Sequence, residues 1–178
     1  RVLFRSLLDD NQWHHVVGVR DSGTLKAYVD GQVAADTEAV TDAVSSSDAV
    51  IGALYDGTLS QDGILDEMRI YNRALSTSEI EDLYNAGVVR VNSSQSGQVT
   101  DGLIGMWSLD GPDITTAVHD RSGGGHDGYV INGATSTMAT VGKVGQALTF
   151  NGVDEYIEIP DSGTDFGGFS EISVMGWA

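Results

Sequence analysis

The sequence predicts an all-β protein built from many short strands. Its 178 residues include 23 glycines and two prolines, and short runs rich in Val, Ile, Tyr and Trp alternate with glycine-containing turns. Branched and aromatic residues favour strands, and glycine allows the tight turns between them. A chain of this length suits one domain of ordinary size.

Composition limits the expected partners. The chain has 26 acidic and 9 basic residues, a net charge of −17. Proteins that bind nucleic acid or anionic membranes use a surplus of Lys and Arg, so we expect neither nucleic-acid binding nor membrane insertion. Cysteine is absent, which excludes disulfides and thiolate metal sites. The acidic surplus is consistent with a solvated surface, with carboxylates grouped as oxygen ligands for Ca²⁺, or with both.

The first two predicted strands are residues 1–8 and residues 13–20. By the period of two, His14 and His15 point to opposite sides of the second strand and cannot bind one metal together. We expect one packed and one surface histidine. The packed face of this strand would carry Trp13, His15, Val17 and Val19.

Tight turns follow in quick succession. Residues 21–23 (DSG) form a turn, and residues 25–29 alternate into Asp30-Gly31, which is typical of a two-residue hairpin loop. Residues 36–48 are polar and predict a loop, and residues 49–55 predict a strand.

Residues 63–71 predict a strand with a carboxylate on its apolar face. Ile64, Met68 and Ile70 share that face with Asp66, while Leu65, Glu67, Arg69 and Tyr71 share the other. A carboxylate that points into a core is costly unless a metal or several hydrogen bonds satisfy it.

A short helix follows this strand. Ser76 can cap its first turn, Glu79 completes a capping box, and Leu75 can pack against Ile80 as a hydrophobic staple. Gly87 is the expected end of the helix. Its narrow apolar stripe is Ile80, Leu83 and Tyr84. The polar residues 89–101 then predict a linker, and a new series of strands begins near Leu103.

Several segments resemble bacterial laminin-G-like domains of the concanavalin A-like lectin/glucanase superfamily. LDEMRIYNRALSTSEIEDLYNAG resembles the closing segment of that family, and WHHVVGVRDSGTLKAYVDGQ resembles its central hallmark. HDRSGGGHDGYV, GKVGQALTFNGVDEYIEIP and FSEISVMGWA resemble its opening segments. The resemblance implies an antiparallel two-sheet jelly-roll sandwich with one short helix.

The order of these segments is inverted. Residues 1–88 resemble the C-terminal half of such a domain, residues 89–101 are the linker, and residues 102–178 resemble the N-terminal half. The chain is then a piece of a tandem array or a circular permutant. The halves can close on each other in one chain, or complete a neighbouring copy. We favour closure in one chain because a short linker gives a high effective concentration.

No catalytic pair is predicted, so we do not expect an enzyme. Glucanases of the superfamily carry a strand of the type E-x-D-x-E, and the nearest approach here is residues 154–158. A retaining glycosidase needs two carboxyl groups about 5–5.5 Å apart, whereas residues three apart on a strand face opposite ways.

Three aspartates are candidate calcium ligands. The resemblance places Asp66 where relatives often hold a structural Ca²⁺, and Asp110 and Asp120 are plausible companions. The alternative is that Asp66 accepts backbone N–H groups and Asp120 caps the HDRSGGG turn. Tyr55 and Tyr129 are candidate sugar-stacking residues, with a place in the sandwich surface or core as the alternative.

The expected function is a noncatalytic carbohydrate-binding or adhesion module, extracellular or on a cell surface, with calcium as its stabilising ion. Its partner would be a glycan or a cell-surface or matrix protein. The alternative is a structural repeat of a surface filament or giant adhesin that assembles with neighbouring copies by strand or domain complementation. Fold alone does not choose between these functions.

Overall fold

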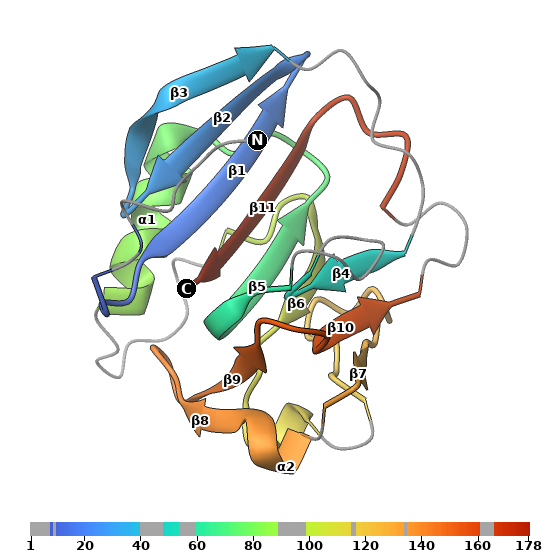
Figure 1. The fold of residues 1–178 in the computed structure, drawn as a ribbon. Coiled ribbons are helices and arrows are strands. Elements are labelled where there is room, and N and C mark those ends of the chain that lie inside the picture. The colour runs from blue at the N-terminus through green and yellow to red at the C-terminus, as the bar shows by residue number, and fades with distance from the viewer. Residues whose placement is uncertain are drawn as a thin grey trace.

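The computed structural model describes residues 8, 10–39, 48–53, 60–88, 99–114, 117–133, 135–160 and 166–178. Two antiparallel sheets make up most of this part of the chain (Figure 1). The strands of the large sheet, in spatial order, are β3 (Gln32–Ala39), β2 (Thr24–Val29), β1 (His15–Asp21), β11 (Ile172–Trp177), β5 (Asp62–Tyr71), β9 (Gln146–Asn151) and β8 (Ala139–Val141), and β6 (Leu103–Trp107) also pairs with β5.

The small sheet has the order β4 (Ala49–Ile51), β10 (Tyr156–Ile159) and β7 (Tyr129–Ile131). The predicted all-β sandwich is confirmed. Among the residues that the structure describes, one long helix, α1 (Thr77–Val88), accompanies the sheets. Two short turns that were not predicted are η1 (Gly111–Asp113) and α2 (Thr135–Met138).

Two hydrophobic clusters lie on opposite faces of the large sheet. One joins its β5, β6 and β9 strands to the small sheet, through residues that include Ile70, Trp107, Leu148, Phe150, Ile157 and Ile159. The other joins β1, β2, β5 and β11 to α1, through Val17, Val19, Tyr28, Tyr71, Met175, Leu75, Ile80 and Leu83. In Figure 1, α1 accordingly lies against the β1–β2–β3 side of the large sheet.

The start of α1 forms as the sequence predicts. The Ser76 hydroxyl accepts the Glu79 N–H (3.3 Å), and the Glu79 carboxylate accepts the Ser76 N–H (2.9 Å), which is the capping box. Leu75 and Ile80 are both buried in the cluster below α1.

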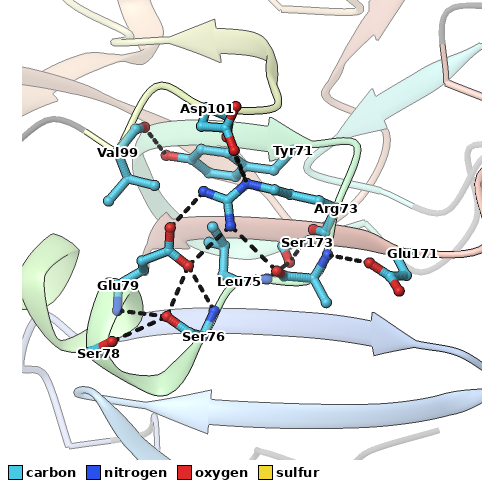
Figure 2. Close-up of polar contacts among 11 residues, drawn as sticks. Tyr71, Arg73, Leu75, Ser76, Ser78, Glu79, Val99, Asp101, Glu171 and Ser173 are labelled. Atoms are coloured by element: carbon cyan, nitrogen blue, oxygen red, sulfur yellow. Dashed lines mark hydrogen bonds and ion pairs between the residues drawn. The ribbon is translucent and has the colours of Figure 1, made fainter.

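A polar network ties this helix start to distant segments (Figure 2). The Arg73 guanidinium donates to both Glu79 carboxylate oxygens (3.0 and 2.6 Å) and to the Asp101 carbonyl (2.8 Å). The Ser173 hydroxyl accepts the Leu75 N–H (2.9 Å) and donates to the Arg73 carbonyl (2.8 Å). Residues far apart in sequence therefore fix the junction between β5 and α1.

Three predictions about these elements need correction. β3 continues to Ala39, whereas residues 36–48 were expected to be a loop; its backbone stays paired with β2 as far as the Ala39–Thr24 pair. Residues 40–47 lie outside the described part. The helix does not stop at Gly87 but includes Val88. A Cβ at Gly87 would collide with the Trp177 ring, so this glycine permits close packing.

The third correction concerns the faces of β5. Leu65, and not Ile64, packs into the same cluster as Met68 and Ile70. The alternation breaks at Glu67, which has a left-handed backbone (φ 51°). On one side of this residue β5 pairs with β9 and on the other with β6. A local irregularity of this kind shifts the side-chain parity.

Candidate functional site

A groove of about 710 Å³ lies on the large sheet. Its floor is formed by β1, β11 and β5, the three central strands that join opposite ends of the sequence. The lining residues are Leu8, Asn11, Gln12, Trp13, Val16, Gly18, Gln61, Asp62, Gly63, Ile64, Leu65, Met68, Val174, Met175, Gly176, Trp177 and Ala178.

Strand alternation places small or exposed side chains on the floor of the groove. On β1, Val17 and Val19 point into the α1 cluster, so Val16 and Gly18 belong to the opposite face. No heavy atom lies within 4 Å of the position that a Cβ on Gly18 would take. Val174, opposite Gly18 in the strand pairing, is 39% exposed. The floor is therefore apolar and accessible.

The walls supply an aromatic ring and polar side chains. Trp13 belongs to neither core cluster and is only partly buried, whereas Trp107 and Trp177 are 0% and 2% exposed. Asn11 and Gln12 lie on the same segment as Trp13, and Gln61 and Asp62 lie at the start of β5; all four are exposed. An aromatic ring beside amide and carboxylate groups is the usual chemistry of a small polar-ligand site.

The Trp13 wall is held by His14. Its Nδ1 lies 2.8 Å from the Asp30 carboxylate and its Nε2 lies 3.0 Å from the Asp10 carboxylate. The hydrogen bond to Asp30 raises the pKa of His14, and the contact with His14 lowers the pKa of Asp10. His15 points the other way and is fully buried, as expected of the packed histidine. The His14 side chain is only 12% exposed, because it lies between two carboxylates, so it is not the surface histidine that was expected.

A second polar locus surrounds Asp66, which is 0% exposed as expected, although it does not share a face with Met68 and Ile70, because the alternation breaks at Glu67. Its Oδ2 accepts the Val144 N–H (2.8 Å), and its Oδ1 has no hydrogen-bond partner. Burial raises the pKa of Asp66 to about 7, and the Glu67 and Asp110 charges add to the effect, while the Val144 bond opposes it.

The three candidate calcium ligands do not converge. Asp110 accepts the Gln146 N–H (2.8 Å), so Asp66 and Asp110 both hold the loop of residues 142–146. Asp120 instead accepts the N–H groups of Met106, Ser122 and His126. Among the residues that the structure describes, no group of three His, Cys, Asp or Glu side chains could hold one metal ion.

The carboxylate oxygens around Asp66 are nevertheless of the kind that a hard cation such as Ca²⁺ binds. The free Oδ1 of Asp66 is a buried oxygen without a partner, and Asp110 lies close enough to act on its pKa. Ca²⁺ takes six to eight oxygen ligands. Backbone carbonyls or water would have to supply most of them. A cation at this locus would neutralise the buried carboxylate.

Of the two predicted sugar-stacking tyrosines, the one that the structure describes, Tyr129, does not line the groove. Tyr129 is 49% exposed on β7, in the small sheet. Tyr55 lies outside the described residues. The carboxylates nearest to a glucanase motif hold a turn: Asn151 donates its N–H to Glu155 (2.9 Å) and its side-chain amide to Asp154 (3.0 Å).

Sequence reasoning missed the groove residues. Trp13 was assigned to the packed face, yet β1 begins only at His15, so strand alternation does not govern it. The usable signal was a tryptophan preceded by Asn11 and Gln12 in a turn segment, just before a strand.

A comparison with known protein families finds a match for the first part of the chain. Residues 2–81 match the family model of a laminin-G-type domain, described as the concanavalin A-like lectin/glucanases superfamily. The match covers less than half of the chain and shows similarity to this superfamily over residues 2–81.

Other comparisons add no further relatives. Neither a curated protein nor a solved structure matches significantly. In the described part of the chain, no helix has the length and apolar character needed to span a membrane.

Proposed function

We propose that the chain is a noncatalytic carbohydrate-binding module, secreted or displayed on a cell surface, that takes a glycan in the groove on the large sheet. The observation that carries the proposal is the groove itself, with partly exposed Trp13 on its wall and Asn11, Gln12, Gln61 and Asp62 at its margins. Sugar faces stack on aromatic rings, and their hydroxyls pair with amides and carboxylates. The similarity of residues 2–81 to the concanavalin A-like lectin/glucanases superfamily supports the same type of function.

Affinity for immobilised or soluble glycans tests this proposal. We expect the wild-type chain to bind at least one polysaccharide on a glycan array, and Trp13→Ala to lose that binding. A stacking contact is worth about 0.5–1.5 kcal/mol beyond its buried area, which is a factor of about 2 to 13 in affinity, and loss of the buried area of the ring should weaken binding further.

Tyr129→Ala is the matched control, because Tyr129 is an exposed aromatic on the other sheet. Binding that survives Trp13→Ala but is lost in Tyr129→Ala would move the site to β7, as the sequence alone suggested. Absence of binding to any glycan on a broad array would contradict the function.

Assembly with neighbouring copies is the second candidate function. Within the described residues, the eight-residue strand β3 ends the large sheet with no partner on its outer side, and its Val33 is 54% exposed. Unprotected edge strands can pair with another chain. Concentration-dependent mass in light scattering, abolished by Val33→Lys, would favour this function.

A further inference from the structure

His14 is placed between two carboxylates that come from different parts of the chain. Nδ1 faces Asp30 in the turn between β2 and β3, and Nε2 faces Asp10 in the segment before β1. The third neighbour, Ala178, contacts only the His14 backbone, through two hydrogen bonds (2.9 and 3.0 Å). Asp10 and Asp30 are the charged groups that face the ring in the part of the chain that the structure describes.

Both contacts require a protonated ring. A neutral imidazole has one N–H and one lone pair, so it can donate to only one carboxylate; the imidazolium donates to both. In the neutral ring, one carboxylate would meet a lone pair at hydrogen-bond distance. The raised pKa of His14 agrees with this geometry.

The contact that would break on deprotonation is the one with Asp10. Asp30 is anchored a second time, because its Oδ1 accepts the His15 N–H (2.9 Å). Asp10 is more weakly held: its side chain is 55% exposed, and its other bond is a local one from the Gln12 N–H (2.9 Å).

We propose that His14 is a pH-sensitive clamp on the groove wall. The imidazolium holds the turn of residues 10–13 against the β2–β3 turn, and loss of its proton releases Asp10 and loosens the wall around Trp13. Asn11, Gln12 and Trp13 all line the groove. Ligand affinity therefore falls as the pH rises through the pKa of His14, a consequence that rests on the proposed function of the groove.

Acrylamide quenching of tryptophan fluorescence tests the clamp without any ligand. Trp107 and Trp177 are buried, so Trp13 provides the quenchable signal, which Trp13→Phe should remove. We expect the quenching constant of the wild type to rise with pH, with the same midpoint as the His14 ring protons in NMR. That midpoint should lie above the ordinary histidine value of about 6.5.

Three variants separate the clamp from a general effect of pH. His14→Gln should quench at the wild-type high-pH level throughout. Asp10→Asn should quench at the low-pH level throughout, because the new amide can donate to the neutral Nε2. His119→Gln is the control: His119 also faces a carboxylate, Asp127 at 3.0 Å, but it does not line the groove, so the pH response should remain.

The clamp is overturned if His14 titrates at or below about pH 6.5, if Trp13 quenching ignores that titration, or if either His14→Gln or Asp10→Asn retains the wild-type response. None of these results depends on finding a glycan. Failure of the clamp and failure of the proposed function are therefore separate outcomes.

Discussion

In the part of the chain that the structure describes, His15 and Asp66 are among the residues with buried polar atoms that lack a hydrogen-bond partner. Both ring nitrogens of His15 and the Oδ1 of Asp66 lack hydrogen bonds. An unpaired buried polar group costs free energy, and a charged one costs more. Each residue therefore makes stability depend on its protonation state, in opposite directions.

His15 should make the fold sensitive to acid. Burial between the Tyr84 and Trp177 rings lowers the pKa of His15 to about 4, against about 6.5 in an unfolded chain. The unfolded state therefore takes up this proton first as the pH falls. Above about pH 6.5 the neutral His15 side chain makes its full contribution to the free energy of unfolding. Between about pH 6.5 and about pH 4 this contribution is lost, and the free energy of unfolding falls by on the order of 3 kcal/mol.

Urea unfolding at about pH 7 and about pH 4.5 measures this loss. His15→Phe fills the same aromatic site without a titrating group, so the difference between the two pH values should shrink relative to wild type. His119→Gln, at a histidine whose side chain is 45% exposed, should leave the difference unchanged. Equal pH dependence in wild type and His15→Phe would show that His15 is not the acid-sensitive group.

The effect of replacing Asp66 on the stability of the fold should depend on the side chain that replaces it. Asp66→Ala leaves the Val144 N–H without an acceptor and should cost about 2–4 kcal/mol. Asp66→Asn keeps an acceptor and removes a charge that burial disfavours. In EDTA at about pH 8, above the raised pKa, Asp66→Asn should equal or exceed the wild type in thermal stability.

Calcium changes this comparison if it binds. At about 100 times its dissociation constant, Ca²⁺ would add about 2.7 kcal/mol to the wild type and much less to Asp66→Asn. Melting curves of both proteins with EDTA and with CaCl₂ distinguish the cases. Coincident wild-type curves under the two conditions would contradict calcium binding.

At the scale of elements, the sequence predicted the turns and helix caps that depend only on residues close together in the chain. Asp30 and Gly31 both have left-handed backbones (φ 52° and 79°), as a tight hairpin requires. The capping box of α1 also formed as predicted. The irregularity at Glu67 and the packing role of Gly87 depend on β6, β9 and Trp177, which no local pattern reveals.

The candidate site was less predictable for the same reason. Asp66 is buried as expected, but not through the strand parity that predicted it, because the irregularity at Glu67 shifts the faces of β5. The groove requires β1 and β11 to be neighbours, and that pairing joins opposite ends of the sequence. The family resemblance predicted the sandwich, but Trp13 became a wall residue only through tertiary structure.

The cap of α1 gives a prediction at this scale. Ser76→Ala removes the hydroxyl that accepts the Glu79 N–H and should lower the free energy of unfolding by about 1 kcal/mol. Thr77→Ala changes the next exposed residue and should cost less. Urea denaturation compares the two; an equal or larger loss in Thr77→Ala would show that the Ser76 hydroxyl does not cap the helix.

At the scale of the whole molecule, the central feature is the seam between β1 and β11. These strands pair from His15–Trp177 to Arg20–Ile172, and the network around Arg73 and Ser173 joins the β5–α1 junction to β11 (Figure 2). The floor of the groove lies on this seam. We propose that residues 1–88 and 102–178 close on each other within one chain, and that the proposed glycan site depends on that closure.

A disulfide across the seam tests this claim most directly. The chain has no cysteine, so Gly18→Cys with Val174→Cys creates a single possible pair. The two residues are partners in the strand register, at the roughly 4.5–5.5 Å Cα separation of such pairs, which suits a disulfide. After oxidation at micromolar concentration, closure within one chain predicts a covalent monomer on a non-reducing gel, whereas disulfide-linked dimers or ladders would contradict it.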